Sequence, residues 1–327
     1  MVKISCRPLQ TVASRPLPQQ AAGPSLLWCR GWQQVWRGRQ LIFTGVPIRF
    51  FLILFFVFIA LPSRAGLRED VEYLSSPLLG GRATGSVGAV ETTWYVQRRF
   101  RAAGLETSMT FLSTSGGVVR NVTGIHRGNP KSSSYVLVTA YYDGLGTVDG
   151  VVYPGADANA SGVAVLLSLA DSLSRSRSNY IFAAIDGHNS GRIGAELLAR
   201  EPWKVSLVAN IDIIGSSLAP PTKVRPDYLI ILGGDDFEKK NSKQFDALNA
   251  GPRLRLFYDY YRSKGFTDYF YNSASDQTPF LQKKIPAVMF TSGITMNTNK
   301  PADTFDTLDY DVLERRRALI LAWLKTL

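Results

Sequence analysis

Five segments of the chain are short and almost entirely apolar, which is the pattern of strands buried on both faces of a sheet. Stretches with helical spacing of apolar residues lie between several of them, for example residues 160–173 and 191–200. Buried strands that alternate with helices predict an α/β fold. We expect a three-layer sandwich with a mostly parallel, mixed central sheet flanked by helices. The five apolar segments are residues 134–143, 179–186, 205–214, 227–234 and 285–292.

The region before these strands combines helical and alternating patterns. Residues 67–76 and 85–106 show the apolar spacing of helices. Residues 108–113 and 117–127 alternate between apolar and polar positions, which predicts two strands of a hairpin. These elements therefore precede the main sheet pattern and extend it.

The chain closes with the helical pattern of residues 310–327, and Asp309 stands where a helix cap is expected. We expect the three arginines at positions 315–317 to be solvated. Asp303, which precedes Thr304, also fits a cap or turn role. His126 is predicted to lie in a surface loop without a partner nearby in the sequence.

Residues 1–65 have a different character from the rest of the chain. They contain eight basic residues and no acidic one, and residues 50–61 form an unbroken apolar run. Twelve residues fall short of the roughly 20 that span a bilayer as a helix. The run matches the apolar region of a secretory signal at about residues 46–65, with Ser63 and Ala65 before the cleavage site. The alternative is a short N-terminal membrane anchor.

We therefore divide the chain into an N-terminal extension with signal peptide, residues 1–65, and a single domain, residues 66–327. The exported domain is expected to be secreted or periplasmic, without stable membrane insertion after signal removal. The long segment before the apolar run suggests a true start codon near Val46.

The charge and the cysteine content of the domain exclude several classes of function. The full chain has 37 Lys and Arg against 26 Asp and Glu, which leaves 29 against 26 once the eight basic residues of the leader are set aside. This balance does not predict a nucleic-acid partner. Both cysteines, Cys6 and Cys29, lie in the leader, which excludes disulfides, thiolate zinc sites and cysteine nucleophiles in the domain.

Polar residues follow the predicted strands, at the sheet edge where ligands bind in such folds. Asp143, His188, Asn189 and Asp212 come directly after apolar runs, and Asp157 precedes a helix. Carboxylates that converge at one edge suggest a divalent-cation site. Taken singly, each aspartate also fits a cap or turn.

From residue 67 to the end, the sequence resembles the zinc exopeptidases of peptidase family M28, which include aminopeptidases and glutamate carboxypeptidase-like proteins. The resemblance rests on seven segments in the family order and implies the zinc-exopeptidase fold. The segments read LLGGRATGS, AYYDG, PGADANASGVAVLLSLA, GHNSGRIGA, NIDIIG, SDQTPFLQKKIPAVMF and NKPADTFDTLD.

The resemblance also implies a metal site, because family members hold two zinc ions with five protein ligands. Two ligand positions are retained here, as Asp157 and Asp212. Three are substituted: Tyr141 and Asn299 stand where the family has histidine, and Asn189 stands where it has glutamate. Catalytic zinc needs three imidazole, thiolate or carboxylate ligands, and a phenol must first lose a proton with an ordinary pKa of about 10.

Other positions around the implied site have changed as well. His188 replaces the general-base glutamate, and Asp276 and Gln277 stand where the family has an Asp-His pair. Asp143, Asp276 and Gln277 are expected to line the cleft or support its ligands. His188 is either a general base or a substitution whose ring is hydrogen-bonded to a retained aspartate. We favour the second, because a base without metal lacks the electrophilic half of the mechanism.

These substitutions lead to three hypotheses. The first is an exported, catalytically inactive M28 peptidase-like protein that binds a peptide or protein ligand in the former active-site cleft, without a cofactor. The alternative is a metal-dependent aminopeptidase or hydrolase with an altered mononuclear site, in which Asp157 and Asp212 hold one weakly bound calcium or magnesium ion. The third is a decayed gene, against which the intact strand and turn signals argue.

Overall fold

The computed structural model describes residues 66–216 and 226–327. The predicted extension and signal, residues 1–65, lie outside the described residues. Pro62–Leu327 forms one compact unit. Within the described part of the chain, no helix is long and apolar enough to cross a membrane.

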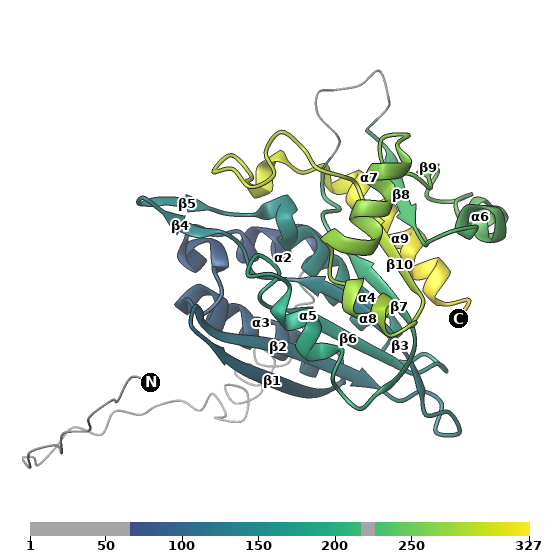
Figure 1. Cartoon of the computed structure of the whole chain (residues 1–327), viewed down its shortest axis with the longest axis horizontal. Coiled ribbons are helices and arrows are strands. Elements are labelled where there is room, and N and C mark those ends of the chain that lie inside the picture. Colours follow the sequence, from purple (N-terminus) through teal and green to yellow (C-terminus); the bar gives the residue numbers. More distant parts are fainter. Residues whose placement is uncertain (1–65, 217–225) are drawn as a thin grey trace, which may run out of the picture. The chain divides into compact units, whose positions relative to one another are not determined.

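An eight-stranded sheet forms the centre of the described domain, in the order β1-β2-β6-β3-β7-β10-β8-β9 (Figure 1). The neighbours β6–β3, β3–β7, β7–β10 and β8–β9 are parallel, whereas β1–β2, β2–β6 and β10–β8 are antiparallel. The predicted mixed, mostly parallel sheet and the predicted hairpin are thereby confirmed. The strands are β1 Glu106–Thr114, β2 Gly117–His126, β3 Ser134–Tyr141, β6 Tyr180–Ile185, β7 Lys204–Ile211, β8 Tyr228–Leu232, β9 Arg255–Phe257 and β10 Ala287–Thr291. A separate small hairpin pairs β4 Gly146–Val148 with β5 Val151–Tyr153.

Helices cover both faces of this sheet because its strands present apolar side chains in both directions. In β3, Val136 and Val138 belong to one buried cluster, and Leu137 and Tyr141 belong to another. The first cluster includes residues of α2 Leu67–Leu74, α3 Val87–Ala102, α4 Gly162–Leu173, α6 Phe237–Leu248 and α9 Tyr310–Leu324. The second includes residues of α5 Ile193–Leu198 and α8 Thr278–Gln282.

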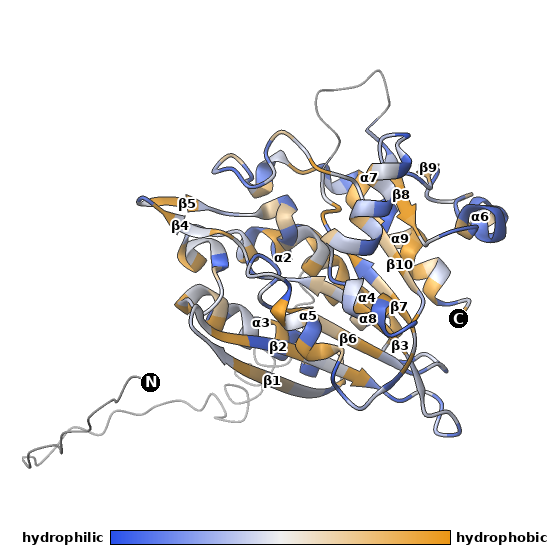
Figure 2. Cartoon of the chain, in the orientation of Figure 1, coloured by the Kyte–Doolittle hydropathy of each residue, from blue (hydrophilic) through white to orange (hydrophobic). Residues whose placement is uncertain are grey.

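The remaining elements are short. A third buried cluster joins β8 and β10 to Tyr260 and Tyr271, next to α7 Lys264–Tyr269. The short turns are η1 Pro77–Arg82, η2 Ala156–Ser161, η3 Phe270–Ala274 and η4 Phe305–Thr307. The central strands are strongly apolar, whereas α6 is mainly hydrophilic, with Phe245 as its buried residue (Figure 2).

Asp309 caps α9, as predicted, by accepting a hydrogen bond from the backbone N–H of Val312. Ser86, which the sequence analysis did not single out, caps α3. Asp303 does not cap a helix. Its carboxylate instead accepts hydrogen bonds from the backbone N–H groups of Asp157 and Ala158, at 2.7 and 3.1 Å.

The prediction that all three arginines of α9 are solvated is wrong for Arg316, which is fully buried. Its guanidinium donates hydrogen bonds to four backbone carbonyls, which belong to Tyr228, Ile214, Ser216 and Pro226. A charged group is stable inside a protein only when its donors are satisfied in this way.

His126 also differs from its prediction. It ends β2 rather than lying in a free loop, and its Nε2 lies 2.8 Å from the carbonyl oxygen of Ser176.

Candidate functional site

The carboxyl ends of the central strands meet at a cavity of about 170 Å³. Five of the predicted site residues line it, from the ends of β3, β6 and β7 and from the loop before α9: Tyr141, His188, Asn189, Asp212 and Asn299. The rest of its wall is largely apolar and includes Ile213, Tyr260, Phe270, Ala274, Met289, Thr291, Ile294 and Thr298. The parallel order of β6, β3 and β7 explains this convergence, because their carboxyl ends lie at one edge of the sheet.

His188 is held in the cavity wall by two contacts. Its ring stacks on Tyr141, with centroids 3.8 Å apart and an angle of 8° between the rings. Its Nδ1 lies 2.9 Å from Oδ2 of Asp276. Burial lowers the pKa of His188, but the Asp276 carboxylate outweighs burial, so the pKa rises to about 9. The imidazole is therefore protonated at neutral pH.

Asp143 is buried beneath this loop and orders it. Its two carboxylate oxygens accept hydrogen bonds from the backbone N–H groups of His188 and Asn189, both at 2.9 Å. The Asn189 side chain also donates to Asp143 Oδ2, at 3.2 Å. Burial raises the pKa of Asp143 to about 6, against the lowering effect of His188. Asp143 thus positions the loop instead of lining the cavity.

Asp212 is the carboxylate that faces the cavity. Ser275 donates a short hydrogen bond to its Oδ2. Burial raises the pKa of Asp212, and the neighbouring His188 cation counteracts this effect. Burial and the nearby Asp212 carboxylate also raise the pKa of Tyr141 well above its ordinary value, so the phenol keeps its proton.

Asp157 does not line this cavity. Its Oδ1 accepts hydrogen bonds from the backbone N–H groups of Gly215 and Ser216, at 2.8 and 3.2 Å. Its Oδ2 is buried and has no hydrogen-bond partner among the described residues. Burial, together with the nearby Asp303 carboxylate, raises the pKa of Asp157 to about 7.

Gln277 is fully buried and does not line the cavity either. Its Oε1 accepts a hydrogen bond from Asn210, at 2.8 Å, and its Nε2 donates to the carbonyl of Tyr271, at 2.7 Å. Gln277 therefore fixes the η3 turn against β7. The adjacent Asp276 points to His188, and its Oδ1 lacks a hydrogen-bond partner in the described part of the chain.

Two features of the site were not singled out in the sequence analysis, although the second lies in the segment LLGGRATGS. One is the aromatic wall formed by Tyr260 and Phe270, whose rings stack with centroids 4.2 Å apart. The other is Arg82, which is buried and donates hydrogen bonds to the carbonyls of Tyr142 and Pro154, at 2.8 and 2.7 Å. Burial lowers the pKa of Arg82 to about 10, although Asp303 and Asp143 oppose that change, and the guanidinium stays charged.

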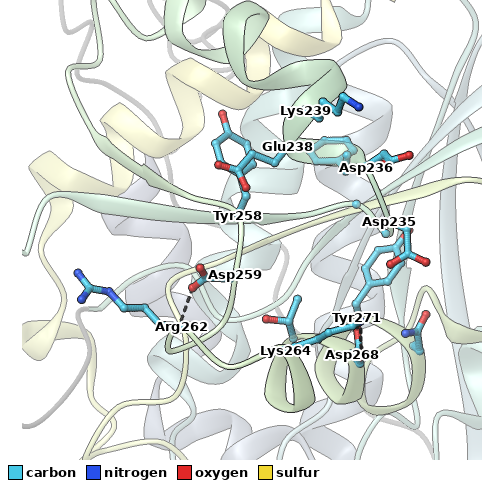
Figure 3. Close-up of a pocket in the computed structure, with 15 residues that line it drawn as sticks. Asp235, Asp236, Glu238, Lys239, Tyr258, Asp259, Arg262, Lys264, Asp268 and Tyr271 are labelled. Carbon is cyan, nitrogen blue, oxygen red and sulfur yellow. Dashed lines mark hydrogen bonds and ion pairs between the residues drawn. The ribbon is translucent and has the colours of Figure 1, made fainter.

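A second, larger cavity of about 690 Å³ lies among the end of β8, the start of α6 and α7 (Figure 3). No predicted site residue lines it. Carboxylates outnumber cations on its wall, but Lys264 is paired with Asp268, and Asp259 accepts a hydrogen bond from the backbone of Arg262. The charged residues of the wall are Asp235, Asp236, Glu238, Asp259, Asp268, Lys239, Arg262 and Lys264.

Sequence comparison assigns the chain to a family. Residues 121–324 match the sequence model of peptidase family M28, and the chain belongs to this family. It is 28% identical over 229 residues to a probable zinc metalloprotease of Leptosphaeria maculans, covering 59% of this chain and 49% of that protein. It is 28% identical over 169 residues to the alkaline phosphatase isozyme conversion protein of Escherichia coli, covering 42% and 48%. The chain thus spans about half the length of the curated relatives it matches.

Solved structures show the same fold at low sequence identity. A zinc aminopeptidase from Bacillus subtilis matches with a TM-score of 0.64 and 13% identity, over 79% of this chain and 93% of that one. The glutaminyl cyclase of Fimbriiglobus ruber matches with a TM-score of 0.65 and 15% identity, over 80% and 94%. The described domain therefore has the fold of M28 aminopeptidases.

The residues at the cavity do not fit the two-zinc centre that the family implies. Asp212 is the sole carboxylate on the described cavity wall, and the other polar side chains there are an imidazole bound to Asp276, amides, and phenol and threonine hydroxyls. No group of three or more His, Cys, Asp or Glu side chains among the described residues is arranged to hold a metal ion. Asp157, predicted to share a cation with Asp212, has one oxygen bound to backbone amides. This donor set lacks the three strong ligands of a catalytic zinc.

Proposed function

We propose that this chain is a noncatalytic member of peptidase family M28 that binds a peptide, free or as a segment of a protein, in the cavity at the carboxyl ends of β3, β6 and β7. The observation that carries the proposal is the stacked pair of Tyr141 and His188, with His188 bound to Asp276. According to the resemblance given above, these are the positions at which the family has a zinc ligand and its general base.

Hydrolysis of a peptide bond needs a polarised carbonyl and a base that activates water. The donor set described above lacks the ligands for a metal that would polarise the carbonyl, and His188, which stands where the resemblance puts the family's base, does not act as one. A protonated His188 has no lone pair with which to accept a proton, and its Nδ1 is already occupied by Asp276. The cavity is nonetheless concave and partly apolar, as ligand sites usually are. Binding without turnover is therefore the function that these residues favour.

Export is the second part of the proposal. It is supported by the unbroken apolar run at residues 50–61 and by the basic, acid-free composition of the leader. N-terminal sequencing of the protein recovered from an expressing cell tests it. A new N-terminus near residue 66 supports cleavage, whereas an intact leader in the membrane fraction supports the anchor.

The activity test uses the full chain, incubated with excess zinc and then dialysed extensively. We expect less than a stoichiometric amount of retained zinc by elemental analysis and no hydrolysis of aminoacyl-p-nitroanilides. The Bacillus subtilis zinc aminopeptidase, treated identically, serves as the positive control. Near-stoichiometric zinc with hydrolysis that Asp212→Asn abolishes would overturn the proposal and support the metal-dependent hydrolase instead.

A binding measurement completes the test. A random peptide library is passed over the immobilised full chain, and retained peptides are sequenced. Retention that is lost in Tyr141→Ala supports a ligand site in the cavity. Equal retention by that variant places the binding elsewhere and contradicts the proposal.

A further inference from the structure

The cavity is enclosed by two pairs of stacked aromatic rings. Tyr141 and His188 form one pair, and Tyr260 and Phe270 form the other, with rings inclined by 8° and 17° respectively. All four residues line the same space. Faces of tyrosine and phenylalanine rings attract organic cations through the ring quadrupole, most strongly where water is excluded.

Two polar groups in this space remain available to a ligand. Asp212 binds Ser275 through Oδ2, and its Oδ1 makes no hydrogen bond with the described residues. The Tyr141 hydroxyl likewise makes none within the described part of the chain, although the residue is only 4% exposed. The site therefore offers an acceptor of hydrogen bonds that carries negative charge, set among aromatic rings.

The balance of charge around the cavity is negative. Asp212 lies on its wall, and Asp143 and Asp276 are buried behind the wall, whereas the cations are His188 on the wall and Arg82 near Asp143. Both cations already have partners: His188 binds Asp276, and Arg82 donates to backbone carbonyls. Asp212 is the carboxylate that faces the cavity, and among the described residues it makes no hydrogen bond to a cation, so a cationic ligand complements the site and an anionic one does not.

The size of the cavity limits which part of a ligand enters. Its volume of about 170 Å³ is smaller than that of most ligand pockets, so it can take one side chain of a peptide and not the whole peptide. A planar guanidinium can stack on an aromatic ring and donate hydrogen bonds to a carboxylate at the same time.

The aromatic wall continues outward onto an exposed rim. Tyr261 contacts Tyr260, and Phe266 and Tyr269 contact Phe270. These three rim residues are 45%, 53% and 58% exposed. Exposed aromatic residues next to a cavity are typical of binding surfaces.

We propose that the cavity binds the cationic side chain of an arginine residue of the peptide ligand. The guanidinium lies between the two aromatic pairs and against Asp212. Neighbouring apolar residues of the same peptide contact the rim formed by Tyr261, Phe266 and Tyr269. This inference rests on the proposed function, of which it names the ligand class. Lysine is the weaker ligand, since its ammonium cannot stack as a plane.

The test compares two probes of almost equal shape and different charge. Binding of Nα-acetyl-arginine amide and Nα-acetyl-citrulline amide to the full chain is measured by titration calorimetry at pH 7. We expect arginine to bind at least tenfold more tightly than citrulline. Equal binding of the two probes, or tighter binding of citrulline, would overturn the proposal without requiring any variant.

Two variants locate the interaction. Asp212→Asn, which keeps an oxygen for Ser275, is expected to weaken arginine binding at least tenfold and to remove the preference over citrulline. Asp235→Asn, in the larger cavity, is the matched control and is expected to change neither probe's affinity by more than twofold. Loss of binding in Asp235→Asn with retention in Asp212→Asn would move the arginine site to the larger cavity and refute the inference.

The rim is tested separately with Nα-acetyl-leucyl-arginine amide and Nα-acetyl-glycyl-arginine amide. We expect the leucyl probe to bind more tightly to the wild type and Phe266→Ala to remove that advantage. An advantage that persists in Phe266→Ala contradicts the role of the rim. If library peptides bind through Tyr141 but arginine shows no preference over citrulline, the proposed function stands and the arginine inference alone fails.

Discussion

Replacement of His188 by glutamine tests whether the imidazole is a structural cation or a free base. The pKa of His188 is raised from the ordinary 6.5 to about 9. A histidine with a raised pKa stabilises the folded state fully below its unfolded pKa, and the effect disappears as the pH rises through the folded pKa. The difference between 6.5 and about 9 corresponds to about 3 kcal/mol in the free energy of unfolding.

The assay is urea unfolding of the wild type and His188→Gln between pH 7 and pH 9.5. We expect the advantage of the wild type to fall by about 2 kcal/mol across this range, because most of the imidazolium is lost within it. Asp143, with a pKa of about 6, titrates chiefly below this range, and Asp157, with a pKa of about 7, titrates at its lower end in both proteins.

A spectroscopic measurement guards against a variant that does not fold. The chain has two histidines, so NMR titration of the wild type resolves His188 from His126, which serves as an internal reference. A wild-type advantage that stays constant or grows with pH, or a His188 resonance that titrates near pH 6.5, would refute the reasoning. The imidazole would then be available as a base at neutral pH.

Three further predictions concern stability, each measured by urea unfolding at pH 7. Arg316→Met removes the donor of hydrogen bonds to four backbone carbonyls and should lower the free energy of unfolding by about 3–5 kcal/mol. Arg317→Met, which loses only an (i, i+3) pair with Glu314, should lower it by less than about 0.5 kcal/mol. Similar losses in the two variants would contradict the role of burial. Asp303→Ala leaves two buried N–H groups without an acceptor and should lower the free energy of unfolding by about 2–4 kcal/mol. Asp303→Asn keeps an acceptor oxygen and should lower it less. Equal losses in the two variants would show that the acceptor oxygen is not the cause. Asp309→Ala removes the cap of α9 and should cost about 1 kcal/mol, and an unchanged midpoint would mean that the cap contributes nothing.

The strands were predictable because a strand that is buried on both faces of the sheet is a run of apolar residues in the sequence. Residues 134–143 are mostly apolar, and β3 indeed packs Val138 toward one layer and Leu137 toward the other. The buried Arg316 was not predictable in this way. Its run of three arginines has the composition of a solvated face, and the carbonyls that satisfy it belong to residues 214–228, which only the folded chain brings to α9.

The site was predictable where it follows from strand order and not where it depends on side-chain direction. Tyr141, His188 and Asp212 follow parallel strands, so their convergence could be expected from the sequence. The direction of Asp157, toward the amides of residues 215 and 216, depends on the path of a turn that has no periodic pattern. Tyr260 reaches the cavity from a segment without any motif, and no sequence signal could have identified it.

The bond between His188 and Asp276 also bears on how such a protein can evolve. A glutamate at position 188, without metal, would place another carboxylate beside Asp276 and near Asp212 and Asp143, in a buried site. Like charges at such distances destabilise one another. A metal bound among these carboxylates would offset the repulsion. We therefore expect His188→Glu alone to destabilise the fold, which limits the single substitutions that position 188 can accept during evolution.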